Sequence, residues 1–108
     1  MKKVFISQPM RDKTDEEILA VRKRAIAYAK DILKTSDIEV IDSFFQNAPV
    51  DARPLWFLGK SLELLSTADL VVFAPGYKDF RGCKIEHLCC EQYGIQTVDM
   101  EELWKERW

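Results

Sequence analysis

Glu86 is the side chain in this sequence best suited to covalent chemistry. It follows Gly82 by four residues, near the predicted start of a helix, where exposed backbone N–H groups and the helix dipole favour a negative charge. We expect this carboxylate to be ionised at neutral pH, and an ionised carboxylate can act as a nucleophile. Acidic residues also occur in first turns for stability alone, so position by itself leaves both interpretations open.

The loop that precedes this helix, residues 76–82, supplies further polar groups. Gly82 stands at the helix entry, where a ligand can approach the backbone closely, and Asp79 and Arg81 are candidate binding side chains. A solvated turn of mixed charge explains the same residues equally well. The sequence contains neither G-x-G-x-x-G nor G-x-x-x-x-G-K, so it indicates neither a dinucleotide site nor a P-loop.

Two more groups of candidates follow the first two predicted strands. Ser7, Gln8 and Arg11 could hold sugar hydroxyls or a phosphate. Asp42 and Phe44 follow the second strand, where an aromatic ring could stack on a nucleobase. Ordinary loop polarity is the alternative for the polar residues, and a place in the core is the alternative for Phe44.

Neither a metal nor another cofactor is expected. His87 is the only histidine, and no second histidine or convergent set of cysteines completes the ligands of a zinc site. Cys83, Cys89 and Cys90 contain no C-x-x-C pair, and an odd number of cysteines does not make a disulfide framework, so we expect reduced thiols. A role as small core residues explains Cys89 and Cys90 better than a role as nucleophiles.

Apolar runs and helix signals alternate along the chain and predict the elements that position these residues. Predicted strands cover residues 3–7, 38–41, 70–74 and 95–99. Predicted helices cover residues 15–34, 54–65, 82–93 and 100–108. Thr14 and Glu17 form a capping box before the first helix, Pro54 suits the first turn of the second, and Gly94 ends the third.

This alternation predicts an α/β fold, an open parallel sheet of four to five strands with helices on both faces, in a flavodoxin-like or Rossmann-like arrangement. The 108 residues suit a single domain over residues 1–108. Ligands of such sheets bind outside the carboxyl ends of the strands. The loops after Ile6, Ile41, Ala74 and Asp99 therefore define the candidate site.

Composition narrows the class of partner. The 16 basic and 18 acidic residues are interleaved and give a net charge of −2, which provides no field to hold a nucleic acid polymer. No apolar stretch approaches the ~20 residues of a membrane span or has the form of a signal peptide. We expect a cytoplasmic protein that acts on a small molecule, with no nucleic acid or membrane as partner.

Three segments of the chain resemble the nucleoside 2-deoxyribosyltransferase superfamily, most closely a small branch of it common in bacteria and phages. They are Val4–Arg11, Leu65–Val72 and Gly82–Ile95, and the resemblance covers nearly the whole chain. The Gly-x-x-x-Glu spacing from Gly82 to Glu86 is its most specific part. The resemblance implies that Glu86 is the catalytic glutamate of a retaining N-glycosyl reaction.

The substrate that the resemblance implies is a (deoxy)nucleoside or a nucleoside monophosphate. The glutamate would attack the anomeric carbon, the base would leave, and water or another base would resolve the glycosyl-enzyme. Better-known family members carry an aspartate on the second helix where this sequence has Ser61, which cannot replace the charge. Asp79 is the nearest remaining candidate for that acid, and Asp69 is interpreted as a structural cap at the entry of the third strand.

The resemblance also implies a homo-oligomer, because the characterised enzymes complete their sites with residues near the C-terminus of a neighbouring subunit. That contribution is either absent here or comes from residues 104–108, whose tryptophans also favour self-association.

Two other functions remain open. Residues 4–7 look like the opening of a TIR domain, a family whose NAD-cleaving members also use a glutamate on a helix. A nucleotide-binding or sensing module that kept the pocket and lost catalysis is the other alternative, and Ser61 permits it.

Overall fold

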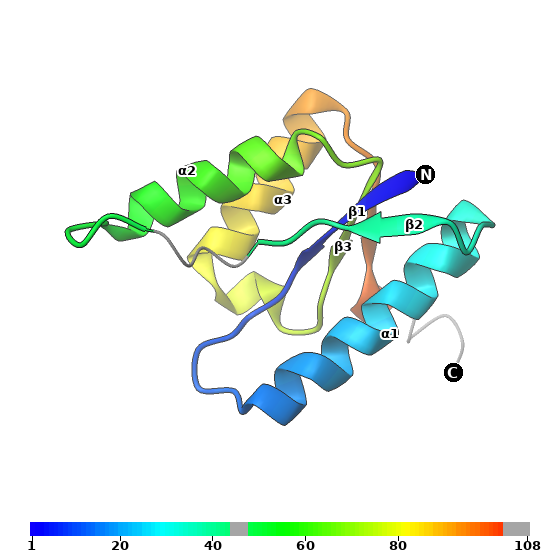
Figure 1. Ribbon diagram of the computed structural model, residues 1–108, viewed down its shortest axis with the longest axis horizontal. Helices are drawn as coiled ribbons and strands as arrows, with labels where there is room; N and C mark the ends of the chain where they lie inside the picture. The colour runs from blue at the N-terminus through cyan, green and yellow to red at the C-terminus, as the bar shows by residue number, and fades with distance from the viewer. Residues whose placement is uncertain (44–47, 103–108) are drawn as a thin grey trace.

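The structure is a computed structural model and describes residues 1–43 and 48–102 (Figure 1). Its elements are β1 (Lys2–Ser7), α1 (Asp15–Leu33), β2 (Ile38–Val40), α2 (Pro54–Leu65), β3 (Leu70–Phe73), the 3-10 turn η1 (Tyr77–Asp79), α3 (Arg81–Tyr93) and β4 (Thr97–Asp99). The sequence predicted the bounds of these helices and strands to within two residues. Residues 100–102 are helical, and the rest of the predicted terminal helix lies outside the described residues.

The four strands form one parallel sheet in the order β2-β1-β3-β4. This is an open sheet of flavodoxin-like order, and it confirms the predicted α/β class. Strands β1 and β3 are central and pair in a register that sets Ser7 opposite Phe73. The carboxyl ends of all four strands therefore lie at one edge, where the sequence predicted the site.

Helices cover both faces of the sheet (Figure 1), and each face has its own apolar cluster. The α1 face buries Val4, Ile6, Leu70, Val72, Ala25 and Ala29. The face beneath α2 and α3 buries Phe5, Val71, Phe73, Leu65, Cys83 and Cys90. Because side chains alternate along β1 and β3, both strands are buried on both faces, which explains their continuous apolar runs. Each large apolar side chain so buried contributes about 1.5–3 kcal/mol.

The helix ends follow the expected capping chemistry. Thr14 Oγ1 accepts a hydrogen bond of 3.1 Å from the Glu17 backbone N–H at the start of α1. Gly94 adopts a left-handed φ of 70° and donates its backbone N–H to Cys90, which ends α3 and turns the chain towards β4. Within the described residues, no helix combines the length and apolar character needed to cross a membrane.

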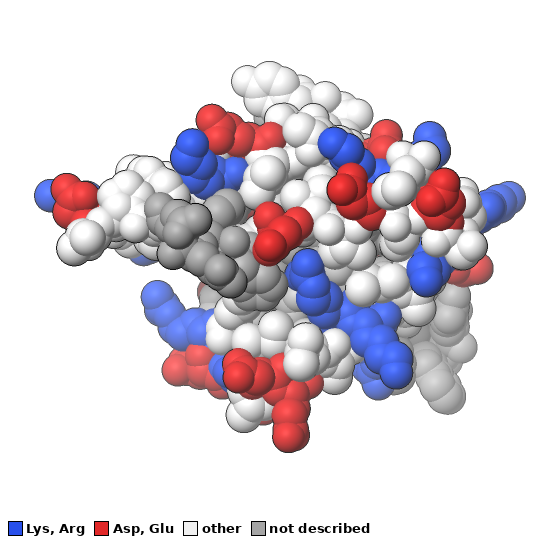
Figure 2. All heavy atoms as spheres, viewed as in Figure 1, with Lys and Arg blue, Asp and Glu red and all other residues white. Residues whose placement is uncertain are grey.

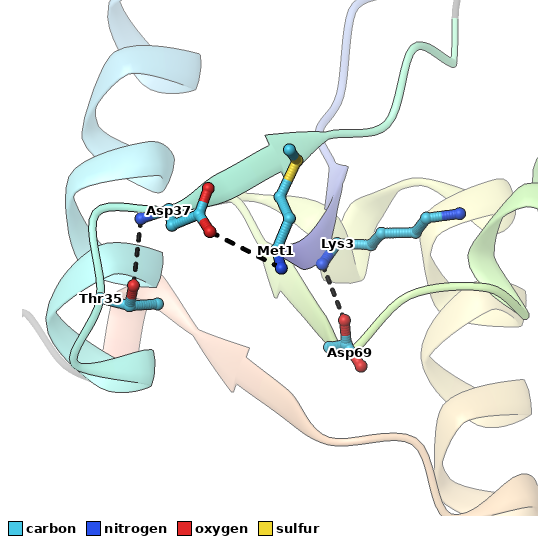
Figure 3. Close-up of polar contacts among 5 residues, drawn as sticks. All are labelled: Met1, Lys3, Thr35, Asp37 and Asp69. Carbon is cyan, nitrogen blue, oxygen red and sulfur yellow. Dashed lines mark hydrogen bonds and ion pairs between the residues drawn. The ribbon is translucent and has the colours of Figure 1, made fainter.

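The amino edge of the sheet, opposite the candidate site, is tied by polar contacts (Figure 3). The Asp69 carboxylate accepts from the Lys3 backbone N–H at 2.8 Å, and the Asp69 backbone N–H donates to the Lys3 carbonyl at 2.8 Å. The Asp37 carboxylate lies 3.6 Å from the amine of Met1. Asp69 thus joins the entries of β1 and β3, which is the structural role that the sequence predicted for it.

Candidate active site

Glu86 lies on the buried side of α3. Cys83, Glu86 and Cys90 are three and four residues apart, so they share one face of the helix, and all three are buried. Only 7% of Glu86 is exposed to solvent. A carboxyl group in this position sits among residues that otherwise form the core beneath α3.

Ser7 is the hydrogen-bond partner of Glu86. It is the last residue of β1 and is 2% exposed, and its Oγ donates to Glu86 Oε1 at 2.9 Å. The contact links the carboxyl end of a central strand to α3, across 79 positions of sequence. We call these two side chains the Ser7–Glu86 pair.

Burial decides the protonation of Glu86. It raises the pKa of the carboxyl group from 4.5 to about 7, although the hydrogen bond from Ser7 lowers the pKa in part. The expectation that Glu86 is fully ionised at neutral pH is not met, because its pKa lies close to pH 7 and both the protonated and the ionised form are present there. Glu86 is the sixth residue of α3, beyond the first turn where the helix dipole acts, so the dipole does not offset the loss of solvent.

Two thiols flank the pair along α3. Burial raises the pKa of Cys83, a hydrogen bond with Ser7 lowers it, and the charge of Glu86 raises it again. Burial and the charge of Glu86 raise the pKa of Cys90 to about 11. Both thiols stay protonated at neutral pH, so they surround Glu86 with uncharged groups. The three cysteines of the chain are free.

Gln8 was predicted as a ligand contact, but its side chain hydrogen-bonds to α1. Its Nε2 donates to the Ile18 carbonyl at 3.1 Å, and its Oε1 accepts from Arg22 at 3.5 Å. The side chain therefore fastens the loop after β1 to the helix that follows. Arg11 and Asp42 are exposed in loops after β1 and β2, and the predicted Phe44 lies outside the described residues.

The remaining predicted residues lie on α2, η1 and the start of α3. Ser61 is half-buried on α2, Asp79 is exposed in η1, Arg81 is the exposed first residue of α3, and Gly82 follows it half-buried. Within residues 1–43 and 48–102, none of these four hydrogen-bonds to Glu86. Of the predicted site residues, the structure thus brings Ser7 and Glu86 into direct contact.

Two of the pockets formed by the described residues open near the carboxyl edge, and the Ser7–Glu86 pair lines neither of these two. One, of about 360 Å³, lies against α1 and includes Gln8 and Lys13 in its wall. The other, of about 400 Å³, lies beside β4 and includes Tyr77, His87 and Asp99.

The residues of the β4 pocket were not predicted as site residues. The His87 ring stacks on Tyr77 at a centroid distance of 5.3 Å, and His87 Nδ1 lies 3.1 Å from Glu91. Burial, followed by the charge of Asp99 and a hydrogen bond to it, raises the pKa of Tyr77 to about 12. The sequence does place Tyr77 after β3 and Asp99 at the end of β4, where a site was expected. It does not show that the two side chains are in contact, because that depends on tertiary packing.

Fold and site together define a class: an α/β protein with a flavodoxin-like parallel sheet and a buried, hydrogen-bonded carboxyl group beside the end of a central strand. No group of three or more His, Cys, Asp or Glu side chains in the described part of the chain is arranged to hold a metal ion. Comparison with models of protein families and with curated proteins gave no match.

Proposed function

We propose that this protein cleaves or transfers the N-glycosidic bond of a (deoxy)nucleoside or a nucleoside monophosphate, with Glu86 as the nucleophile. The observation that carries the proposal is the Ser7–Glu86 pair, a buried carboxyl group with a pKa of about 7 at the carboxyl edge of the sheet. Strongly shifted carboxyl groups at the ligand-binding edge of α/β sheets are typical of functional sites.

The reaction proceeds in two displacements. An ionised Glu86 oxygen forms a bond to the anomeric carbon as the bond from that carbon to the base nitrogen breaks, and the base leaves with the electron pair and takes up a proton. Water or a second base then attacks the same carbon and releases the carboxylate. The sugar keeps its original configuration because it is inverted twice.

Ser7 positions the carboxyl group for this attack. Its hydroxyl donates to Oε1, so it holds one oxygen of Glu86 and stabilises the ionised form that attacks. The sequence offered Ser7 as a ligand contact, and the hydrogen bond supports a role in which Ser7 acts through Glu86 instead.

The test is release of free base from a panel of deoxynucleosides and their monophosphates, followed by chromatography. The wild type is expected to release base, and Glu86→Gln is expected to lose the activity. Glu91→Gln is the matched control, because it makes the same change at an exposed position of the same helix. Absence of base from every substrate, or full activity of Glu86→Gln, would refute the proposal. NAD belongs in the panel, since release of nicotinamide would indicate the TIR-like reaction.

A nucleotide-binding or sensing module is the second candidate. Partial protonation of Glu86 at neutral pH favours this candidate, because it lowers the fraction of Glu86 that can act as a nucleophile. The serine at position 61 favours it too, because it cannot supply the acidic group expected there. A ligand that binds only the folded state raises the melting temperature. A rise in melting temperature with a nucleotide, without base release on long incubation, would identify this function.

A further inference from the structure

The β4 pocket lies at the carboxyl end of an edge strand, and the proposed reaction uses none of its residues. Its volume of about 400 Å³ lies within the range of roughly 300–1,000 Å³ that is typical of pockets for small ligands. Residues of η1, α3, β4 and the helical turn after β4 converge on it. The wall is formed by Tyr77, Lys78, His87, Thr97, Val98, Asp99 and Glu102.

The wall of the pocket carries more negative than positive charge. Asp99 and Glu102 each contribute a carboxylate, whereas Lys78 is the only lysine or arginine among the wall residues. Glu101 lies between the two acidic residues in the sequence. Burial raises the pKa of the Tyr77 hydroxyl, and the charges of all three carboxylates raise it further, to about 12. The same charges attract a cation into the pocket and repel an anion.

Asp99 is held in place by the protein and can still accept from a ligand. The Tyr77 hydroxyl donates to its carboxylate, and the Glu101 backbone N–H donates to Oδ1 at 2.9 Å. An ionised carboxylate offers about four acceptor positions, so these two bonds do not use all of them. Because Asp99 is half-buried, a charged N–H donor would bind it more strongly than it binds a fully exposed carboxylate.

An ammonium group of the chain itself lies against the aromatic part of the wall. Lys78 Nζ is 5.9 Å from the centroid of the Tyr77 ring, within the range of a cation–π contact. The Tyr77 ring is fixed by stacking on His87 at 5.3 Å. Lys78 is exposed, so it can move aside at small cost. This part of the wall therefore accommodates a positive charge, which a ligand could supply in place of Lys78.

Other kinds of occupant fit the pocket less well. In residues 1–43 and 48–102, no three His, Cys, Asp or Glu side chains are arranged to hold a metal ion. An anion would meet the two carboxylates of the wall. Figure 2 shows acidic and basic side chains interspersed over one face of the molecule, and the net charge of the chain is −2. The preference for a cation is therefore a property of the pocket, because the protein as a whole has no strong field of one sign.

We propose that the β4 pocket binds a small organic cation, an amine or a guanidine, whose N–H groups donate to Asp99 and Glu102. Its positive charge lies beside the Tyr77 ring and displaces Lys78. The proposal concerns binding alone and does not rest on the glycosidic activity.

The experiment is titration of the full chain at neutral pH and constant ionic strength, followed by two-dimensional amide NMR. The probes are butylamine, butylguanidine, butanol and butyrate, which share one alkyl chain and differ in the charged or polar group. At least one of the two cations is expected to bind saturably, with a dissociation constant of about 1 mM, and to shift the resonances of residues 77–78, 87 and 97–99. Butanol and butyrate should give no saturable shift there, and the tighter cation identifies the preferred group.

Three variants test the contacts. Asp99→Asn keeps the size of the side chain and should weaken binding about tenfold or more, because a charge-assisted hydrogen bond is lost. Glu102→Gln should weaken it about threefold, since Glu102 is exposed. Lys78→Met should strengthen binding about threefold, because it removes the competing ammonium group. The matched control is Glu39→Gln, an exposed position on β2 at the opposite edge of the sheet, which should bind like the wild type.

Several results would overturn the proposal: no saturable shift with either cation, equal binding of butanol, unchanged affinity in Asp99→Asn, or weaker binding in Lys78→Met. If Asp99→Asn loses the dispersed spectrum of a folded protein, Glu102→Gln and Lys78→Met decide the outcome, since both change exposed side chains. None of these measurements depends on substrate turnover, so they are independent of the test for base release.

Discussion

Replacing Glu86 by glutamine should stabilise the protein, and only above the pH at which free glutamate ionises. Glutamine keeps the size of the side chain and can still accept the hydrogen bond from Ser7, but it carries no charge. In the wild type, the folded state holds its proton until about pH 7, whereas an unfolded glutamate releases it near pH 4.5. Between these values the folded state binds more protons, so the wild type loses stability as the pH rises.

The size of the effect follows from the difference between the two pKa values. A shift from 4.5 to about 7 corresponds to about 3 kcal/mol at 1.36 kcal/mol per pKa unit. At pH 4 Glu86 is protonated in both the folded and the unfolded state, so it does not destabilise the wild type. At pH 8 it is ionised in both states, and the full destabilisation is present. The free energy of unfolding of Glu86→Gln relative to wild type should therefore rise by about 3 kcal/mol from pH 4 to pH 8.

Urea unfolding of both proteins at pH 4, 6 and 8 measures this difference. In a domain of this size, about 3 kcal/mol also corresponds to a rise in melting temperature of roughly 12–24 °C. Glu91→Gln serves as the control, since Glu91 is exposed and should give a small difference at each pH. A difference between Glu86→Gln and wild type that stays constant from pH 4 to pH 8 would refute the assignment of Glu86 as a buried, proton-binding group.

Four further outcomes are expected. The kcat/KM for base release should rise about ninetyfold from pH 5 to pH 8, following the ionised fraction of Glu86 with a pKa of about 7, and a rate that falls over this range would assign Glu86 as an acid instead. Ser7→Ala should move the midpoint of that pH profile upward, because the hydrogen bond that favours the ionised form is lost; an unmoved midpoint would remove Ser7 from the positioning role. Asp69→Ala should lower stability in urea by about 1 kcal/mol, through loss of the bond to Lys3, and leave base release unchanged. Gly94→Ala should cost about 1 kcal/mol in the same assay, because alanine is strained at a left-handed φ.

The fold could be predicted from local signals because these agree with the tertiary structure along most of the chain. The apolar runs at 3–7 and 70–74 are continuous because β1 and β3 are central and covered on both faces. Pro54 and Gly94 mark a helix start and a helix end, since each suits its backbone position and few other residues do. Helix α2 shows the limit of this reasoning, because its leucines predicted a helix without showing how few of them the chain itself would bury.

The sequence predicts where the candidate residues lie in the fold but not which of them are in contact. The places of Ser7 at the end of β1 and of Glu86 on α3 follow from local sequence signals, whereas the hydrogen bond between them depends on how α3 packs against β1. Burial also raises the pKa of Glu86 towards neutrality, against the expected full ionisation, because the loss of solvent acts on a side chain beyond the first turn of α3. Gln8 was predicted as a ligand contact, but its amide hydrogen-bonds to α1. No sequence motif indicates this contact.

The energetics of Glu86 favour a functional over a structural explanation of this residue. An apolar side chain between Cys83 and Cys90 would complete the core beneath α3, whereas the carboxyl group weakens the fold by about 3 kcal/mol at neutral to alkaline pH. Natural proteins keep a destabilising side chain of this kind where their activity needs it. A purely structural Glu86 would need a compensating charge partner, and its described partner is the neutral hydroxyl of Ser7. The same pairing leaves the carboxyl group close to the midpoint of its titration, so that small changes on ligand binding can ionise it.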